Sequence, residues 1–253
     1  MLALYHAEPA ANSLKVLIAL HEKGLPFESR YVDLHKFEQH EPWFVKINPD
    51  GQVPVLDHDG ALIVQTTVIN EYLEDVFPDQ NPLRPADPVK RAHTRVWNKF
   101  CDEHVMNHVS MHGWHRMVSI IARSVESDEF EQLMSRIPLK EQREKWRTAR
   151  SGFAQDQLDE ATRKIEVACN RVEAALADGP WLIGDFYSLA DINFFSYCGI
   201  AVGRMFPEMV TAQSHPRLTD WVERMRARPG VAMALAGPDH TDPKLRTFTG
   251  EAR

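Results

Sequence analysis

Residues 51–64 read GQVPVLDHDGALIV, and this stretch decides the fold of the first third of the chain. Two short apolar runs, Val53–Leu56 and Ala61–Val64, flank the turn sequence His58-Asp59-Gly60. Glycine supplies the positive φ that tight hairpin turns require, so the pattern predicts an antiparallel hairpin. Pro54 has no N–H to donate, and we therefore expect it at a strand edge or a bend.

A strand, a helix and a second strand are predicted before this hairpin. The runs Leu2–Tyr5 and Phe27–Asp33 are typical of short strands. Between them, Ala11–Lys23 carries apolar residues at helical spacing, and Gly24 follows where a helix commonly ends. Because a helix joins the two strands, we expect them to be parallel. A helix over Thr66–Phe77 completes the unit.

The rest of the chain is predicted to form a linker and a helical domain. Residues 79–90, DQNPLRPADPVK, combine three prolines with polar residues, which is linker composition. Ser188 and Asp191 have the spacing of a capping box. Helical patterns recur over about 91–125, 155–177, 189–203 and 216–228, without a convincing strand. The predicted organisation is an α/β domain of residues 1–79, a linker of 80–90 and an all-α domain of 91–253.

Composition argues against several classes of protein. The net charge of −7 disfavours binding to nucleic acid or to anionic membranes, which require clustered Lys and Arg. Cys101, Cys169 and Cys198 form no CxxC motif, so neither a disulfide framework nor a zinc ribbon fits. No apolar run approaches the roughly 20 residues of a membrane span, and the N-terminus lacks a signal-peptide pattern. We expect a soluble cytoplasmic protein.

The start of the first helix is a candidate anion site. Free N–H groups and the positive end of the helix dipole favour an anion beside Ala11-Asn12-Ser13, and a hydroxyl adds a hydrogen bond. A thiol there would ionise more readily, but no Cys is nearby, so a ligand would supply it. The alternative is that Asn12 or Ser13 only caps the helix. If the Val53-Pro54 bond is cis rather than trans, the Val53 backbone faces outward and can pair with an extended peptide ligand.

A second candidate site is a row of histidines. His104, His108, His112 and His115 fall within about 80° of one another on a helix. The row faces either solvent or the cleft between the domains, and a metal is disfavoured because HExxH and a coordinating Cys are absent. Interleaved Met and Trp residues, including Met111, suit a pocket for aromatic ligands.

Aromatic side chains elsewhere have two interpretations. Tyr197, with neighbouring Phe194, Phe195 and Phe206, forms either the opposite pocket wall or helical core. Tyr5 lies within the first strand, and we expect it to be a packing residue.

Several segments together resemble the glutathione S-transferase family over almost the whole chain. The resemblance rests on the element order, the Val-Pro step, QTTVINEYLE and GPWLIGDFYSLADI. It implies a thioredoxin-like α/β domain followed by an all-α domain, with glutathione as co-substrate. Within the family, KFEQHEPWFVKINPDGQVPVL, NPLRPADPVKRA and the insertion PLKEQREKWRTARSGFAQDQLDE resemble bacterial β-etherases that cleave lignin-derived β-aryl ethers, of the type acting on the β(S) stereoisomer.

The resemblance implies roles for residues that match the family's glutathione site. Ser13 matches the serine that donates to the sulfur, with Asn12 as a second donor. Val53, before Pro54, matches the residue whose backbone pairs with the cysteinyl unit. His40 falls where related members place a side chain on the glycine carboxylate.

One pair departs from the family pattern. Gln65-Thr66 stands where the family usually has Glu-Ser, which hold the γ-glutamyl group. Gln lacks the charge that would pair with an ammonium, so Asp102 or Glu103 of the partner subunit is a candidate replacement.

The implied activity is displacement of a phenol from an aromatic ketone by the glutathione thiolate. The implied substrate pocket contains His108, Met111, His112, His115 and Tyr197, and no metal. The expected partners are the aromatic ether and a second copy of the chain, although a heterodimer is an alternative. Other possibilities are a glutathione transferase or dehalogenase for another aromatic electrophile, and a non-catalytic subunit of the same fold.

Overall fold

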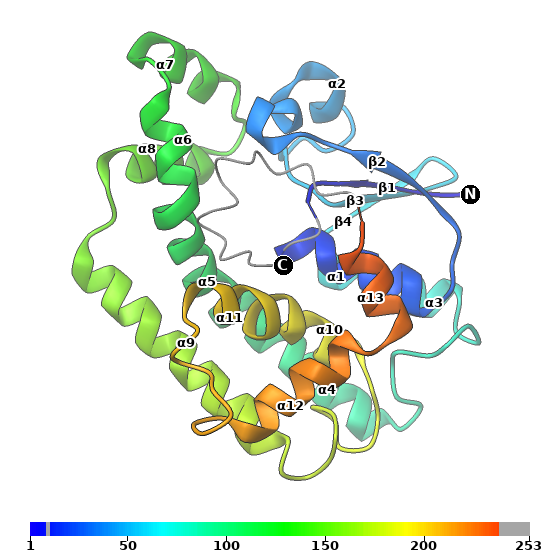
Figure 1. Ribbon diagram of the computed structural model, residues 1–253. Coiled ribbons are helices and arrows are strands. Elements are labelled where there is room, and N and C mark those ends of the chain that lie inside the picture. Colours follow the sequence, from blue (N-terminus) through cyan, green and yellow to red (C-terminus); the bar gives the residue numbers. More distant parts are fainter. Residues whose placement is uncertain (9–10, 238–253) are drawn as a thin grey trace.

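The computed structural model describes residues 1–8 and 11–237, and its first part is a four-stranded sheet with the order β2-β1-β3-β4 (Figure 1). Its strands are β1 (Leu2–His6), β2 (Phe27–Tyr31), β3 (Val55–His58) and β4 (Ala61–Val64). Strand β1 pairs parallel with β2 and antiparallel with β3, and β3 pairs antiparallel with β4. The predicted parallel pair and the predicted hairpin are both confirmed.

Helices α1 (Ala11–Glu22) and α3 (Thr66–Val76) pack on this sheet. The apolar side chains between the sheet and the two helices are fully buried, among them Leu4, Ile18 and Leu73. Helix α1 is buried on nearly all sides because α13 (Pro229–Leu235) covers its other face, as Figure 1 shows.

A long connection leads from β2 to β3. It contains the 3-10 turns η1 (Leu34–Lys36) and η2 (Glu38–His40) and the short helix α2 (Pro42–Val45). The connection ends at the Val53-Pro54 peptide bond, which is cis. This segment therefore reaches over one end of the sheet before the chain enters the hairpin.

The second part of the chain begins with one long, interrupted helix. Helix α4 (Pro88–Phe100) starts within the predicted linker because Asp87 accepts a hydrogen bond from the Lys90 N–H at 2.7 Å and Pro88 opens the first turn. Two π segments then alternate with α-helix. The pieces are η3 (Cys101–Val105), α5 (Met106–Gly113), η4 (Trp114–Val118) and α6 (Ser119–Ser124).

Two helices follow that the sequence patterns did not predict, α7 (Ser127–Arg136) and α8 (Lys140–Ser151). Their apolar faces are narrow, since only Trp146 and Ala149 of α8 are buried. Trp146 packs on Phe37 of the β2–β3 connection, with ring centroids 4.8 Å apart. The insertion thus contacts the first part of the chain across the space between the two parts.

The remaining helices are α9 (Gln155–Ala175), α10 (Leu189–Phe194), α11 (Val202–Met205) and α12 (Pro216–Arg226), with the π segment η5 (Phe195–Ala201) between α10 and α11. The predicted capping box is confirmed: Ser188 accepts from the Ala190 N–H at 3.2 Å, and Asp191 accepts from the Ser188 N–H at 3.0 Å. Asp191 also accepts from the indole N–H of Trp221, which ties α10 to α12.

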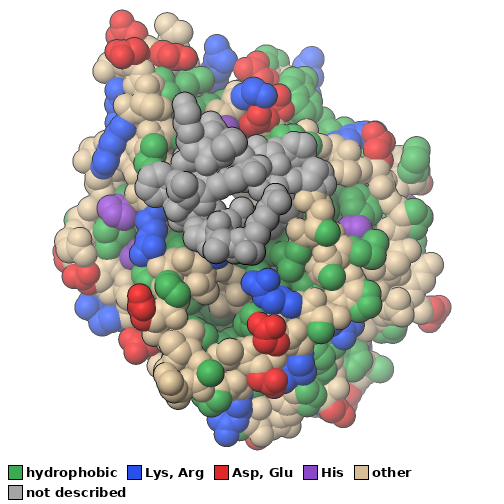
Figure 2. All heavy atoms as spheres, in the orientation of Figure 1, with side chains coloured by type: hydrophobic (Ala, Val, Ile, Leu, Met, Phe, Trp, Pro, Cys, Tyr) green, Lys and Arg blue, Asp and Glu red, His purple; other side chains and the backbone are tan. Residues whose placement is uncertain are grey.

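Within the described part of this helical region, extended pairing is limited to two isolated bridges near residues 181–186. Residues 238–253 of the predicted all-α domain lie outside the described residues, and the predicted boundaries at 79 and 91 stay a prediction. None of the described helices is long and apolar enough to cross a membrane. On the face shown in Figure 2, acidic and basic side chains are interspersed.

Candidate functional site

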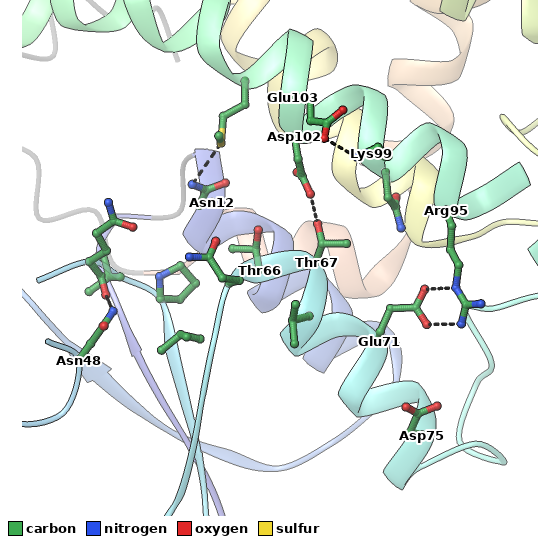
Figure 3. A pocket seen from close by; sticks show the side chains of 18 residues that line it. Asn12, Asn48, Thr66, Thr67, Glu71, Asp75, Arg95, Lys99, Asp102 and Glu103 are labelled. Atoms are coloured by element: carbon green, nitrogen blue, oxygen red, sulfur yellow. Dashed lines mark hydrogen bonds and ion pairs between the residues drawn. The ribbon is translucent and has the colours of Figure 1, made fainter. Parts of the chain in front are cut away.

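A cavity of about 710 Å³ opens where the hairpin, the start of α3 and the long helix meet (Figure 3). Its walls come from the segment before β3, from the first turns of α1 and α3, and from α4 through η3 into α5. Five predicted site residues line it: Asn12, Val53, Pro54, Gln65 and Thr66.

Asn12 occupies the first turn of α1 and is held by a tyrosine from the helical part. The Tyr197 hydroxyl donates to the Asn12 Oδ1 atom at 2.8 Å. The Asn12 Nδ2 group consequently remains as the donor on the cavity side, where it donates to the Met106 sulfur at 3.8 Å. An amide N–H at a helix N-terminus is suited to an anionic ligand.

Ser13 lies deeper than Asn12. Its side chain is buried, and its Oγ accepts a hydrogen bond from the Ala7 N–H at 3.1 Å. Ser13 does not appear among the described residues that line the cavity. Its predicted role as a sulfur donor stays a prediction, and Asn12 is the better placed of the two.

The start of α3 carries a polar cluster built on Asp102. Thr67 Oγ1 donates to one Asp102 oxygen at 2.5 Å (Figure 3). The buried Lys15 ammonium lies 3.2 Å from the other Asp102 oxygen. Asp102 lies on η3 and lines the cavity together with Gln65 and Thr66. Asp102 of this same chain, as well as a carboxylate from a partner subunit, is therefore available beside Gln65-Thr66, the pair that departs from the family pattern.

Lys15 also connects this carboxylate to the tyrosine that holds Asn12. Its ammonium lies 4.7 Å from the centroid of the Tyr197 ring. Asp102, Lys15, Tyr197 and Asn12 thus form one continuous chain of contacts behind the cavity wall. Burial raises the pKa of Tyr197 well above its usual value, so its hydroxyl keeps the proton that it donates to Asn12.

The far rim of the cavity carries paired charges. Glu71 lies 3.4 Å from the Arg95 Nε atom and 3.1 Å from Arg84, and Lys99 pairs with Glu103. These groups are partly exposed and neutralise one another, so the rim adds little net charge to the site.

His40 lies behind the loop that lines the cavity and is not itself among the described lining residues. It is 7% exposed, and its Nδ1 atom is buried without a hydrogen-bond partner. A Cβ at Gly51, where φ is +62°, would lie 2.6 Å from this atom, so the loop needs glycine there. Burial lowers the pKa of His40 to about 4, which leaves the ring uncharged at neutral pH.

Asn48 fixes the same loop. Its Nδ2 donates to the Gln52 carbonyl at 2.7 Å, and its Oδ1 accepts from the Asp50 N–H at 3.1 Å. Gln52 and Val53 then present the loop edge to the cavity. The role of His40 toward a carboxylate stays a prediction. In the structure, Asn48 holds the loop in place.

The histidine row faces away from the cavity. His112 is buried, and its Nε2 lies 3.1 Å from the Leu158 carbonyl and 3.0 Å from the Thr162 hydroxyl of α9. The His115 ring packs edge-on against Phe153, just before α9. His108 contacts the His104 carbonyl of its own helix.

None of His108, Met111, His112 and His115 is among the described residues that line this cavity, and their place in a substrate pocket stays a prediction. The long helix packs on α9 with its histidine face, so Met106 on the opposite face meets Asn12. Among the described residues, no group of three or more His, Cys, Asp or Glu is arranged to hold a metal ion.

Tyr197 is also absent from the lining of this cavity, and its place in a substrate pocket stays a prediction. It is 2% exposed and supports Asn12 from behind instead of lining the described cavity. Phe194 and Phe195 are fully buried, so the core interpretation of these aromatics is the correct one. Tyr5 packs edge-on against Phe44, as expected for a packing residue.

Comparison with known protein families identifies the family to which this architecture belongs. The glutathione S-transferase N-terminal domain matches residues 1–75, and the glutathione S-transferase C-terminal domain matches residues 113–229. The chain belongs to the glutathione S-transferase family. This membership confirms the expected fold, a thioredoxin-like α/β domain followed by an all-α domain.

Individual members of the glutathione S-transferase family are similar over nearly the full length. Protein LigF of Sphingobium sp. strain SYK-6 is 49% identical over 234 residues, 91% of each chain. The crystal structure of the β-etherase LigF superposes with a TM-score of 0.89 and 47% identity, covering 92% of this chain and 98% of that one. Glutathione transferase F7 from Populus trichocarpa gives a TM-score of 0.72 at 25% identity, covering 93% and 99%.

The sequence signals for the residues that were missed are weak. Thr67 directly follows Gln65-Thr66, and nothing in its neighbours distinguishes it from a helix-surface threonine. Tyr197 is predicted as a residue of the substrate pocket, not as a hydrogen-bond partner of Asn12. Its contact with Asn12 spans 185 residues of sequence, so no local pattern reports it.

Proposed function

We propose that this glutathione S-transferase cleaves β-aryl ether bonds in lignin-derived aromatic ketones, using glutathione as the attacking thiol. The observation that carries this proposal is the similarity to the β-etherase LigF, which is 47% identical with a TM-score of 0.89 over 92% of the chain. The products are a glutathione thioether and a phenol.

The cavity has groups of the right chemistry along the length of a tripeptide. The Val53 backbone beside Pro54 pairs with the cysteinyl unit of glutathione, as an added strand would. Gln65 and Thr66 hold the γ-glutamyl carboxylate at the start of α3, and Asp102 accepts from the ammonium. The glycyl end lies toward the loop that Asn48 holds, with His40 behind it.

The thiolate lies at the N-terminus of α1. Asn12 Nδ2 donates to the sulfur, and the Ser13 hydroxyl, which accepts from the Ala7 N–H and keeps its own proton, adds a second donor from below. A thiol with an ordinary pKa of about 8.5 is only a few per cent ionised at neutral pH. Lowering that pKa by about two units makes the thiolate dominant and corresponds to roughly 2.7 kcal/mol of preferential stabilisation.

The thiolate attacks the carbon that bears the aryloxy group, and the adjacent ketone makes that carbon electrophilic. The new C–S bond forms on the side opposite the breaking C–O bond, so the configuration of the carbon inverts. Holding both reactants in one site and stabilising the thiolate supply most of the acceleration.

The test is release of phenol from each enantiomer of a β-aryl ether ketone in the presence of glutathione. We expect release from one enantiomer and a matching yield of thioether. Asn12→Ala should slow the reaction by about 10- to 100-fold, because a charge-assisted hydrogen bond to the thiolate is lost. Gln132→Ala, which alters an exposed amide of α7 outside the residues that line the cavity, is the control. Absence of phenol from both enantiomers would refute the proposal.

We also propose that two copies associate in the cytoplasm through α3 and α4. Val68 of α3 and Val96 of α4 are 55% and 53% exposed, and Val68 extends the cavity wall toward this surface. Paired apolar side chains of this kind mark association surfaces. A homodimer should dissociate in light scattering when Val96→Glu and Val68→Glu are combined, and a wild-type monomer would contradict it. Mixed dimers with a related chain are detected by co-expression.

A further inference from the structure

Helix α8, which lies within the insertion, brings one lysine into an unusual environment. The Lys145 ammonium donates to the Ser110 hydroxyl of α5 at 2.9 Å and lies 4.6 Å from the centroid of the Trp114 ring. No carboxylate of the described residues pairs with it, although other cations of α8, such as Lys140 and Arg147, have acidic partners. A partly buried ammonium held only by a hydroxyl and a ring has capacity for an anion or a developing oxyanion.

Ser110, the partner of the lysine, lies on the face of the long helix that carries Met106, beyond the residues that line the cavity. Met106 meets Asn12 across the cavity, and Ser110 follows Met106 by four residues, which is one helical turn and about 6 Å along the helix. The opposite face carries His112 and packs on α9. Lys145 therefore binds this helix face about one turn beyond Met106, the residue that contacts Asn12.

This separation fits the geometry of the proposed displacement. In an in-line attack, sulfur approaches carbon at roughly 3–3.5 Å, and the leaving oxygen lies on the far side of that carbon. Sulfur and leaving oxygen are then roughly 5 Å apart, close to the length of one helical turn. An aryl ether whose carbon faces Asn12 places its aryloxy oxygen toward Ser110 and Lys145, with Trp114 beside the aryl ring.

We propose that Lys145 is the general acid that protonates the departing aryloxide. This step rests on the proposed ether cleavage and completes it. As the thiolate forms the C–S bond, the electron pair of the C–O bond passes to the aryloxy oxygen. That oxygen takes a proton from the Lys145 ammonium and leaves as a neutral phenol, and the resulting amine regains a proton from water.

The proton transfer is favourable in this setting. Burial lowers the pKa of Lys145 to about 8, whereas phenols such as the tyrosine side chain ionise near 10. The surrounding ionisable groups are directed elsewhere: Arg150 bonds the Ala122 and Val125 carbonyls, Arg116 bonds the Met205 carbonyl, and the His115 ring packs on Phe153. Lys145 is protonated at neutral pH and gives its proton to a more basic aryloxide.

The experiment compares Lys145→Met with wild type on two ether ketones that differ only in the phenol released. One releases a methoxyphenol, whose anion needs a proton, and the other releases a nitrophenol, which departs readily as the anion. Loss of a general acid should reduce kcat about 100-fold for the first ether and less than about 3-fold for the second. Lys145→Arg restores the charge without an available proton, so it should stay slow on the methoxyphenol ether.

Two further readouts separate an acid from a structural residue. Wild-type kcat on the methoxyphenol ether should fall above about pH 8, as Lys145 loses its proton, and this limb should vanish in Lys145→Met. Wild type should also shift the ionisation of bound nitrophenol toward its coloured anion, and Lys145→Met should abolish that shift. Lys140→Met, on the exposed side of the same helix, is the matched control and should behave as wild type.

The outcomes distinguish the two proposals. If wild type releases no phenol from either enantiomer of either ether, the ether cleavage itself is refuted. If wild type is active but Lys145→Met slows both ethers equally, or keeps the upper pH limb, Lys145 is not the acid. Equal slowing is also the result expected if the ammonium bound the ketone oxygen instead of the leaving oxygen.

Discussion

Replacing Tyr197 by Phe tests whether the orientation of Asn12 controls the reactivity of bound glutathione. The substitution removes one hydroxyl, whose 2.8 Å hydrogen bond to the Asn12 Oδ1 atom is buried, and leaves the ring in the core. A neutral hydrogen bond of this kind contributes about 1 kcal/mol. The equilibrium constant that favours the Asn12 orientation with Nδ2 directed into the cavity would then fall about fivefold.

The same energy sets the expected size of the two measured effects. If the full 1 kcal/mol is felt by the thiolate, the pKa of bound glutathione rises by about 0.7, and kcat/KM at neutral pH falls about fivefold. The thiolate is followed by its ultraviolet absorbance during a pH titration of the glutathione complex. Tyr72→Phe removes a hydroxyl bonded at 2.8 Å to His58, away from the cavity, and should leave both quantities unchanged.

A double-mutant cycle decides whether Tyr197 acts through Asn12. Asn12→Ala removes the amide, so adding Tyr197→Phe to it should cause no further change in the thiol pKa or the rate. The expected coupling is about 1 kcal/mol, close to the whole effect of the tyrosine substitution. Additive effects in the double variant would show that the tyrosine hydroxyl acts by another route, and the reasoning from the 2.8 Å contact would be refuted.

Three further predictions concern the stability of the fold. Glu74→Gln leaves the buried Lys23 ammonium without its carboxylate partner at 2.6 Å and should lower the free energy of unfolding, measured by urea titration, by about 3–5 kcal/mol. The control Glu144→Gln removes the acidic partner of an exposed ion pair and should change this free energy by less than about 1 kcal/mol. Because the pKa of His40 is depressed to about 4, its contribution to the free energy of unfolding is complete above pH 6.5, the ordinary histidine pKa, and is lost as the pH falls toward 4. The free energy of unfolding measured over this range should fall by up to about 3 kcal/mol in wild type, and this fall should be missing in His40→Gln. Gly230→Ala would place a Cβ 2.7 Å from the last backbone nitrogen of α1 and should lower thermal stability by about 1–3 kcal/mol, an effect contradicted by an unchanged melting curve.

Local sequence signals predicted the elements that local chemistry controls. The hairpin at Gly60 follows from a glycine between two apolar runs, and the Ser188–Asp191 cap needs only the spacing of two polar residues. Helices α7 and α8 were missed because their sequence is mostly charged, and only Trp146 and Ala149 of α8 are buried. Their stability comes from packing on Phe37, a contact across more than 100 residues of sequence.

The site residues predicted from the sequence that line the cavity all belong to the sheet part of the chain. Residues in the sheet part, such as Asn12 and Gln65, lie in the cavity because strand order and helix starts fix their positions. For the helical part, the spacing of the histidines identified a common face but contained no information on its direction. Packing of that face on α9 left Met106 and Asp102 as the residues that meet the cavity.

The two π segments make parts of the long helix tolerant of a change in chain length. Segment η3 (Cys101–Val105) contributes Asp102 to the cavity and directly precedes Met106, and η4 begins at Trp114. A π turn holds about one residue more than an α turn, so deleting one residue within η3 would let this turn become α-helical while Met106 and Ser110 keep their orientation. Deleting one residue from the regular turns of α5 would instead rotate every later position by about 100° about the helix axis. The π segments are therefore the points at which this helix can lose a residue with its cavity side left unchanged.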